Sequence, residues 1–431
     1  MNTSRRTHFE KLLLALTLVI PLARLGYAEP IGEAMGKAHE LLKDHKSGAP
    51  AVGAAVEPGS NESRAELMRR AEVWSPTDVE SADIAKGALG FSDLGPADTI
   101  TCQYDAQRTA KAKTSSQTNT SSKFFCKDEK HGLFRVKYGD KEDVAQTAAT
   151  KLAWALGFGA DPKYNTTVKC AGCPDDPWKS LDPQGGGRGS KSDPSHVATF
   201  PLASVEFQME KEAAAKGFTV KAIEEKEGQG WSFKEIDNMD GNIPDLKTHR
   251  DGLKLLGVFL QHVDNATRQQ RLVCLRPRDS SPEAPCPKPF MYIEDLGSTF
   301  GASSGMHVGQ NGKFSLSAWI SNCVWSPEAP GRIGHLPGIK FHGSTLVNPE
   351  ISDAGRQFLG SLLGRLSQDQ IRQLFETAGV EAFSQTPEGG GAGVAAWVEG
   401  FNLRVKEIQE GRCLDAERSQ LQSKVGTPKK K

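Results

Sequence analysis

Short apolar stretches alternate with polar segments in the first half of the chain. Three of these stretches have the length and composition of strands, and they span residues 99–104, 123–127 and 132–138. Residues 114–122 are all Ser, Thr, Gln or Asn, which predicts a flexible loop between the first two strands. Apolar residues then recur four apart from Val144 to Leu156, and Gly157 is placed to end the predicted helix. The order strand, strand, strand, helix indicates a small unit built around a sheet.

Longer helical patterns dominate the second half. Residues 253–263 are apolar enough to form a buried helix, and strand-like runs follow at 271–275 and 290–294. Ser367 and Gln370 have the spacing of a capping box at the start of a further helix. The apolar face of a last predicted helix consists of Val394, Trp397, Val398, Phe401, Val405 and Ile408. Such a face usually packs on a core, so we expect this half to be mainly helical.

The first residues have the organisation of a secretion signal. Arg5 and Arg6 precede an apolar run at residues 12–23, and the small residues around Ala28 suit a signal peptidase. We therefore expect a signal peptide over residues 1–28 and an exported protein, which would be periplasmic, secreted or in the secretory pathway. A retained anchor needs about 20 uninterrupted apolar residues. The run is shorter than that, so no integral membrane segment is expected after cleavage.

Composition divides the rest of the chain into segments. Residues 29–97 are rich in Ala, Gly, Glu and Ser, which predicts a loosely ordered lead-in. The small unit is expected over residues 98–178 and the helical unit over residues 201–415. A Gly-rich linker at residues 179–200 would join them. A basic tail at residues 416–431 would end the chain.

The charge balance argues against binding to nucleic acid or anionic lipid, and the cysteine positions predict disulfides. Lys and Arg together number 53, as do Asp and Glu, so no global field attracts nucleic acid or an anionic lipid surface. All eight cysteines lie beyond the predicted cleavage site. An oxidising compartment makes disulfides the default for such cysteines.

The cysteine positions suggest particular disulfides. The candidate pairs, in order of preference, are Cys274 with Cys286, Cys102 with Cys126, and Cys170 with Cys173. The first pair flanks a Pro-rich insert between two predicted strands, and the second lies on neighbouring predicted strands. The third is a Cys-x-x-Cys motif, for which a structural disulfide is favoured while metal and redox roles stay open. The motif lacks a second Cys-x-x-Cys for zinc and the following His that haem attachment needs.

Three polar residues stand at the ends of predicted elements. Lys137 ends a strand whose other face is apolar, Asp264 follows the buried helix, and Asp295 follows an apolar strand. His262 precedes Asp264 by two residues, and Gly297 follows Asp295 by two. In this order they resemble the protein-kinase-like fold, including HipA-like and secreted kinase-like proteins. That fold has a strand lysine, a His-x-Asp loop and an Asp-x-Gly turn.

The resemblance implies an α+β, bilobal fold with a small β-rich N-lobe that carries one helix and a larger, mainly helical C-lobe. It also implies phosphoryl transfer from ATP or another nucleoside triphosphate with Mg²⁺ or Mn²⁺. Lys137 would bind the phosphates, Asp264 would act on the acceptor hydroxyl, and Asp295 would hold the metal. Gln269, five residues after Asp264, would be a second metal ligand in place of the usual Asn. The acceptor is not specified by these residues.

The chain differs from the kinase pattern beside the strand lysine. Arg135 stands where kinases keep a small residue under the adenine, and it would obstruct adenine or bind phosphate. A polar run that ends at Lys123 replaces the Gly-rich loop, and its hydroxyls, amides and ammonium group could cap phosphates. Gln146 is the best-aligned helix partner for Lys137, because Glu142 lies close to the lysine in the sequence.

Three functions are consistent with these observations. The first is an exported, divergent kinase-like phosphotransferase, and the second is a catalytically degenerate kinase-like binding or scaffold protein. The third is an unrelated disulfide-braced exported protein, in which Lys137 is a solvated strand lysine and Asp264 and Asp295 are turn residues. The chain has no Gly-x-Ser-x-Gly, His-Glu-x-x-His or Walker motif. Convergence of the three residues on one site would separate the first two functions from the third.

Overall fold

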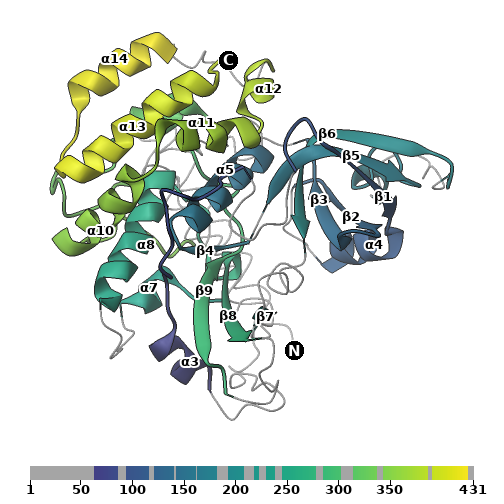
Figure 1. Ribbon diagram of the computed structural model, residues 1–431, viewed down its shortest axis with the longest axis horizontal. Coiled ribbons are helices and arrows are strands. Elements are labelled where there is room, and N and C mark those ends of the chain that lie inside the picture. Colours follow the sequence, from purple (N-terminus) through teal and green to yellow (C-terminus); the bar gives the residue numbers. More distant parts are fainter. Residues whose placement is uncertain are drawn as a thin grey trace, which may run out of the picture. The chain divides into compact units, whose positions relative to one another are not determined.

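The computed structural model divides the chain into two units, residues 1–54 and 55–431, and the described part lies in the second. The described residues are 63–85, 94–115, 121–139, 142–161, 163–181, 193–207, 218–222, 230–237, 245–277, 285–301, 314–336, 343–386 and 391–425. The predicted signal peptide and the Gly-rich run at residues 185–189 fall outside them. The fold is a mixture of α-helices and largely antiparallel sheets (Figure 1).

Five strands close into a barrel in the order β1-β2-β3-β6-β5. They are β1 Thr99–Tyr104, β2 Lys123–Asp128, β3 Gly132–Lys137, β5 Tyr164–Ala171 and β6 Val197–Phe207. All neighbours are antiparallel except β1 and β5. Phe124, Phe134 and Val136 point into an apolar interior. Because side chains alternate along a strand, Arg135 and Lys137 lie on the opposite face of β3.

The barrel is larger than the small unit that the sequence predicted. Strand β6 pairs with both β3 and β5, although its residues were assigned to the linker and the helical unit. Its interior-facing Phe200, Ala203 and Val205 are buried, which is the reason why it joins the barrel. Helix α4 (Ala106–Ser115), which the sequence did not predict, follows β1 and ends at the start of the polar run. The Thr109 hydroxyl accepts a hydrogen bond from the Phe125 amide and so ties α4 to β2.

Helix α5 (Glu142–Ala155) and a second sheet follow the barrel strands. The second sheet has the order β4-β9-β8-β7, formed by β4 Gly159–Ala160, β9 Lys288–Ile293, β8 Gln270–Pro277 and β7 Phe218–Ala222. Almost every side chain of α5 is buried, because the helix packs against β6 and helix α11. A helix that is buried all round holds its polar residues rigidly, and α5 carries two of the site residues described below.

The α-helices that follow α5 in the described part of the chain are α7 Phe233–Ile236, α8 Leu246–Leu260, α9 Leu316–Ser321, α10 Asp353–Gly364, α11 Gln368–Thr377, α12 Val380–Ser384, α13 Val394–Glu410 and α14 Asp415–Val425. Of these, α8, α11 and α13 correspond to predicted patterns, with shifted ends, and the remaining ones were not predicted. Helix α8 begins well before residue 253, and Ser367 forms the expected capping box at the start of α11. Helix α14 replaces most of the expected basic tail, because its Leu421 is buried against the core.

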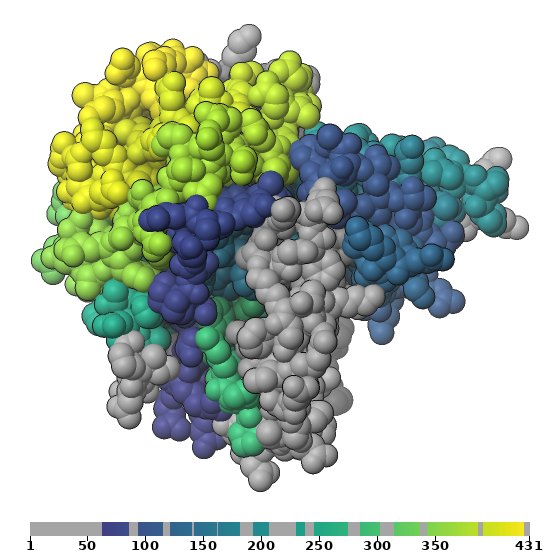
Figure 2. Space-filling view, in the orientation of Figure 1, coloured from purple at the N-terminus to yellow at the C-terminus, as the bar shows by residue number. Residues whose placement is uncertain are grey.

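Residues 63–85 belong to the core and are not the loosely ordered lead-in that composition predicted. Ser63 caps helix α3 (Arg64–Arg70) with a full capping box. Leu67, Val73 and Ile84 are buried in the same apolar cluster as the C-terminal helices. The segment, purple in Figure 2, lies beside β9 at Glu72 and reaches helix α11 at Val79, whose carbonyl accepts Gln370 Nε2 at 2.8 Å. Its apolar residues are too widely spaced for a composition average to reveal them, and tertiary packing decides their burial.

Four disulfides join all eight cysteines: Cys102–Cys126, Cys170–Cys173, Cys274–Cys286 and Cys323–Cys413. The first three are the pairs that the sequence suggested. The fourth spans 90 residues, a separation at which spacing alone indicates no pairing. Among the described helices, none is long and apolar enough to cross a membrane.

Candidate functional site

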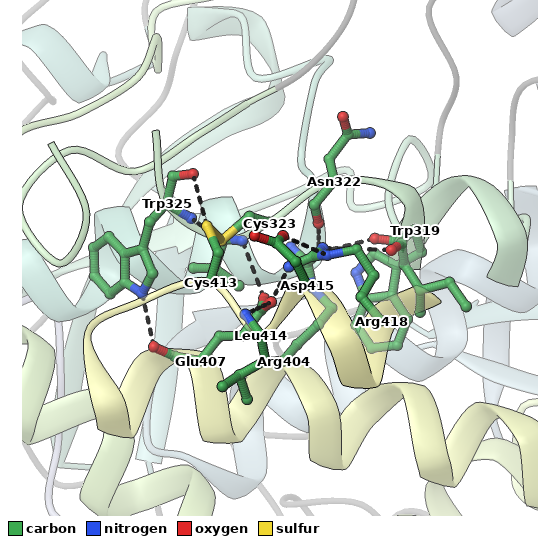
Figure 3. Close-up of a disulfide and its surroundings, with 12 residues drawn as sticks. Trp319, Asn322, Cys323, Trp325, Arg404, Glu407, Cys413, Leu414, Asp415 and Arg418 are labelled. Atoms are coloured by element: carbon green, nitrogen blue, oxygen red, sulfur yellow. Dashed lines mark hydrogen bonds and ion pairs between the residues drawn. A yellow bond between two sulfur atoms is a disulfide. The ribbon is translucent and has the colours of Figure 1, made fainter. Parts of the chain in front are cut away.

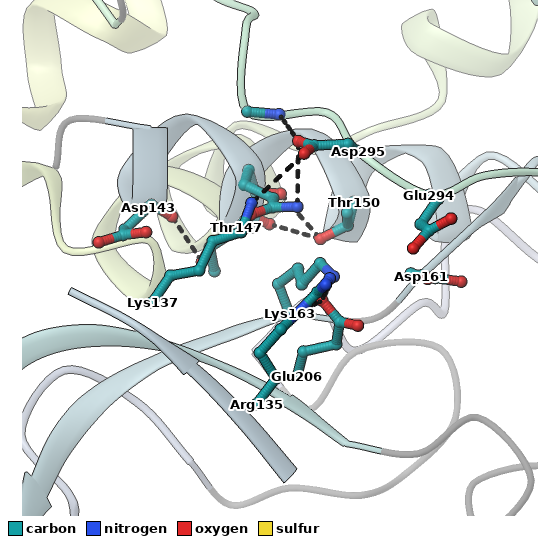
Figure 4. Close-up of polar contacts among 12 residues, drawn as sticks. Arg135, Lys137, Asp143, Thr147, Thr150, Asp161, Lys163, Glu206, Glu294 and Asp295 are labelled. Atoms are coloured by element: carbon teal, nitrogen blue, oxygen red, sulfur yellow. Dashed lines mark hydrogen bonds and ion pairs between the residues drawn. The ribbon is translucent and has the colours of Figure 1, made fainter. Parts of the chain in front are cut away.

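Lys137, the last residue of β3, is buried and surrounded by polar partners (Figure 4). Its Nζ donates to Gln146 Oε1 at 3.1 Å and to Glu142 Oε1 at 3.3 Å, and it pairs with Asp295 Oδ2 at 3.4 Å. Lys137 is therefore not a solvated strand lysine. Burial alone would lower the pKa of Lys137, but Asp295 and Glu142 outweigh it and hold that pKa above its ordinary value.

Helix α5 supplies two partners to Lys137, where the sequence favoured one. Glu142 and Gln146 lie four residues apart, so their side chains point to the same side of the helix. Gly139, just after β3, has a φ of 74°, a conformation that favours glycine. The Glu142 carboxylate, at the first residue of α5, reaches the lysine despite its closeness in sequence.

Asp295 follows β9 and completes the cluster from the second sheet. Its Oδ1 accepts the Gly297 amide at 2.9 Å and the Gln146 side-chain amide at 3.4 Å. Burial would raise the pKa of Asp295, but Lys137 and the Gly297 amide hold it well below its usual range. Asp295 is thus a carboxylate at neutral pH, and a quarter of its side chain (26%) remains exposed.

Gly297 leaves room for the Glu142 side chain. A Cβ at position 297 would lie 2.1 Å from Glu142 Cγ, well inside van der Waals contact. Any other residue there would displace Glu142 from Lys137. The close approach of α5 to the Asp-Leu-Gly turn therefore requires a residue without a Cβ at position 297.

Asp264 lies in the loop that follows α8. The loop runs beside the segment after Asp295, because the Val263 amide donates to the Ser298 carbonyl at 3.3 Å. The Asp264 carboxylate accepts Gln269 Nε2 at 3.2 Å and pairs with Arg268 at 3.4 Å. Burial raises the pKa of Asp264, Arg268 opposes this effect, and nearby Asp295 adds to it. The carboxylates of residues 264 and 295 therefore lie close enough to repel each other.

Gln269 bridges the two aspartate segments. Its backbone carbonyl accepts the Glu294 amide at 2.9 Å, while its side-chain nitrogen donates to Asp264. The side-chain oxygen of Gln269 and the carboxylates of Asp264 and Asp295 are hard oxygen donors, which suit Mg²⁺ or Mn²⁺. The residues present therefore fit a divalent cation at this place.

Two further residues shape the Asp264 loop. The Asn265 side chain accepts the amides of Thr345 and Leu346 at 2.6 and 2.7 Å and donates to the His262 carbonyl at 2.7 Å. Sequence reasoning missed this anchor, because its partners lie 80 residues away. His262 is fully buried, and within the described part of the chain neither ring nitrogen has a hydrogen-bond partner. Burial lowers the pKa of His262 to about 4, so the ring is neutral.

Additional charges extend the cluster beyond the predicted residues. Arg135 and Lys163 both pair with Glu206 of β6. Arg271 of β8 pairs with Asp161 at 3.2 Å and with Glu294 at 2.9 Å. Burial holds the pKa of Lys163 well below its ordinary value. Apart from Arg135, these residues carried no motif in the sequence, because only the packing of separate elements brings them together. Figure 4 shows Arg135, Lys163 and Glu206 close together, with Asp161 near Glu294.

Lys123 lies beside Lys137, its partner in the β2–β3 register. Only 3% of it is exposed, and its Nζ lies 5.1 Å from the centre of the Trp178 ring. Among the predicted site residues, Lys137 contacts Asp295 and Gln269 contacts Asp264. The charges of Arg135, Lys137 and Asp295 act on Lys123, and the charge of Asp295 acts on Asp264.

Comparison with known proteins found likenesses among solved structures. No protein-family model matches the chain, and no curated protein matches it. The chain is similar to the crystal structure of the Helicobacter pylori proinflammatory kinase CtkA, with 11% sequence identity and a TM-score of 0.36. The match covers 77% of this chain and all of that one.

Proposed function

We propose that this chain is an exported, kinase-like phosphotransferase that moves a phosphoryl group from ATP or another nucleoside triphosphate to a hydroxyl acceptor. The observation that carries the proposal is the convergence of Lys137, Asp264 and Asp295, which come from three different elements. A paired cation beside two carboxylates is the arrangement that phosphoryl transfer needs. The bilobal, kinase-like architecture is part of the same proposal.

Each residue then has a role that matches its surroundings. Lys137, held by Glu142 and Gln146, would bind the donor phosphates. Asp264 would orient the acceptor hydroxyl and take its proton, a role that suits a carboxylate whose pKa is raised by burial. Asp295 stays ionised and, with Gln269, would hold the divalent cation. When bound, Mg²⁺ or Mn²⁺ supplies positive charge that offsets the phosphate charge.

The cysteines support the export part of the proposal. All eight are paired in disulfides, which persist in oxidising compartments and are rare in the cytosol. Together with the signal-like N-terminus, this favours a periplasmic, secreted or secretory-pathway protein.

A degenerate binding or scaffold protein is the second candidate, and Arg135 favours it. The Arg135–Glu206 pair, joined by Lys163, occupies the face of the barrel beside Lys137. Lys137 itself is engaged directly with Asp295. Because these charges already neutralise one another, the fold does not need a bound substrate to balance them. A protein with such a site could keep its fold after losing catalytic activity.

A nucleotide-binding measurement distinguishes the phosphotransferase from the scaffold protein. We expect Mg²⁺–ATP or Mn²⁺–ATP to raise the melting temperature of the wild-type protein by mass action. Asp295→Asn should remove the metal-dependent part of the shift, whereas Asp353→Asn, a change at an exposed aspartate, should not. Absence of any shift at millimolar nucleotide with either metal would reject the phosphotransferase and favour the scaffold.

A further inference from the structure

Two disulfides lie against each other inside the barrel. The Cys102–Cys126 bond joins β1 to β2. The Cys170–Cys173 bond joins the end of β5 to the turn that follows it. The Sγ atoms of Cys126 and Cys170 are 3.7 Å apart, and the Sγ atom of Cys102 lies within 4.8 Å of both. Three sulfur atoms from two different disulfides therefore converge on one place.

Cys102 is the central member of this group, because β1 lies between β2 and β5 in the barrel. It is the register partner of Cys170 on β5. Neighbouring strands lie about 4.8 Å apart. This spacing is within the Cα separation of about 4.4–6.8 Å that a disulfide spans. Cys102 can therefore bond to Cys126, as it does in the structure, or to Cys170.

The surroundings favour exchange within the group. All four cysteines are buried in the apolar interior of the barrel, among Phe124, Phe134 and Val168. A thiolate released here lies beside the neighbouring disulfide, and groups held together react much faster than groups that must meet by diffusion. The cysteines of the other two disulfides belong to or pack against the larger apolar cluster, so they lie outside this group.

We propose that the four barrel cysteines form a thiol–disulfide exchange site for a dithiol, in which the bond of Cys102 moves from Cys126 to Cys170. A thiolate of the dithiol attacks Cys173 Sγ, and Cys170 leaves as a thiolate. Cys170 then attacks Cys102 Sγ, and Cys126 leaves as a thiolate. The second sulfur of the dithiol attacks the mixed disulfide and releases Cys173.

The net reaction balances. The dithiol loses two electrons and becomes a disulfide, while the protein goes from two barrel disulfides to one. Cys126 and Cys173 take up the two protons that the dithiol releases. The dithiol reaches Cys173 when the turn after β5 opens, and the side chain of Asp175, two residues further on, is 92% exposed. Nucleotide binding plays no part in this reaction, so the proposal is independent of the proposed function.

The exchange releases a loop that reaches the candidate functional site. Asp176, three residues after Cys173, accepts the Tyr138 hydroxyl at 2.6 Å. The Tyr138 oxygen in turn accepts the Trp178 amide at 3.0 Å. Tyr138 directly follows Lys137 in the chain. A bonded Cys173 ties the start of this loop to β5, and its release removes that covalent tie beside Lys137.

Single cysteine substitutions test the transfer without a reductant. Cys173→Ser leaves Cys170 as the thiol, and Cys126→Ser leaves Cys102. Exchange should divide the thiol between Cys170 and Cys126 in the first variant, and between Cys102 and Cys173 in the second. The two sites should share it within about tenfold, because each side of the exchange has one thiol and one disulfide. Acid-quenched alkylation in denaturant, followed by mass mapping without reductant, locates the thiol.

Cys286→Ser is the matched control, because it leaves Cys274 as a single thiol in the other apolar cluster. Its label should stay on Cys274 alone. Amide hydrogen exchange gives a second readout, with helix α13 as the internal reference for global stability. In Cys126→Ser, the amides of Trp178 and Lys179 should exchange at least about tenfold faster than in the control. The substitution lies on β2, so faster exchange in this loop requires the bond to move.

Label found only on Cys170 in Cys173→Ser and only on Cys102 in Cys126→Ser would overturn the proposal. If both variants misfold, limiting dithiol added to the wild-type protein decides the question. Transfer gives thiols at Cys126 and Cys173, whereas simple reduction gives both thiols of one original pair and refutes transfer. Transfer without faster amide exchange at Trp178 would overturn the link to Lys137.

Discussion

Two buried groups of charged residues in this molecule are satisfied in different ways. One is the site cluster of Lys137, Glu142, Asp264 and Asp295. The other is the helical cluster, which consists of Arg404 and Glu407 of α13 and Arg418 of α14, beside the Cys323–Cys413 disulfide (Figure 3). Both bury ionised groups, but their partners differ in kind.

The helical cluster is satisfied mainly by fixed backbone groups. Arg404 is fully buried and donates to the carbonyls of Val258, Phe259, Trp319 and Asn322 at 2.8–3.2 Å. Glu407 accepts the amides of Val324 and Leu414, each at 3.2 Å, and pairs with Arg418. Two of the carbonyls that Arg404 binds lie near the end of α8, so this cluster also supports the helix that leads to Asp264.

The two aspartates of the site cluster remain partly accessible. The side chains of Asp295 and Asp264 are 26% and 20% exposed, whereas Lys137 and Glu142 are buried. On the strands around the cluster, within the described residues, Asp161 Oδ1, Ser204 Oγ and the side-chain amide of Gln270 have no hydrogen-bond partner. Native proteins rarely leave buried polar atoms unsatisfied. The comparison indicates that the helical cluster holds the fold together, while the site cluster keeps capacity for a ligand.

The largest expected effect is on catalysis at Asp264. Asp264→Asn should reduce phosphoryl transfer by about 10²- to 10⁴-fold, because the amide cannot accept the acceptor's proton. Nucleotide affinity should stay nearly unchanged, whereas Asp295→Asn should weaken both affinity and turnover. Nucleotide turnover and binding measured side by side will check this. Unchanged turnover in Asp264→Asn would make this aspartate a turn residue.

Breaking the helical cluster should mainly affect stability. Glu407→Ala leaves Arg418 buried without its partner, and the free energy of unfolding should fall by about 3–5 kcal/mol. Asp295→Asn should cost less, because Lys137 keeps Glu142 and Gln146. Urea denaturation will measure both, with the exposed Glu399→Ala as the control. Equal losses for Glu407→Ala and Asp295→Asn would remove the distinction between the clusters.

The disulfides provide a smaller test of the same comparison. The Cys323–Cys413 bond closes a loop with a sequence separation of 90, against 12 for Cys274–Cys286. The chain-entropy model predicts that replacing the first pair by Ser lowers stability by about 2 kcal/mol more than replacing the second. Thermal and urea unfolding of the two double variants will show the difference. A larger loss from the Cys274–Cys286 pair would mean that native-state contacts, and not loop length, determine the contribution.

The smallest expected effect concerns pH and His262. Its pKa in the folded protein, about 4, lies below the unfolded value near 6.5, so the unfolded state binds more protons between these limits. Its contribution to stability is therefore complete above about pH 6.5 and is lost as the pH falls, by at most about 1.4 kcal/mol for each pH unit. His262→Leu should flatten the stability profile between pH 4 and 6.5, while the exposed His196→Asn should leave it unchanged. Identical profiles for the wild type and His262→Leu would contradict the burial argument.

Local patterns predicted much of this molecule. Strands β1, β2 and β3 and helices α5, α11 and α13 lie close to where their periodicity placed them. Lys137 and Asp295 were found because each ends an apolar strand, a position that local sequence can indicate. Cys274 and Cys286 were paired because only a short insert separates them.

Tertiary structure alone decided the remainder. Strand β6 joins the barrel, and residues 63–85 join the core, through partners that are distant in the sequence. Glu206 and Arg271 carried no motif, because their significance lies in charges that other elements bring to them. The spacing of apolar residues predicts which face of a helix or strand is buried, because that spacing is set within a few residues of the chain. Which polar groups then meet depends on how whole elements pack, and a single sequence does not encode that locally.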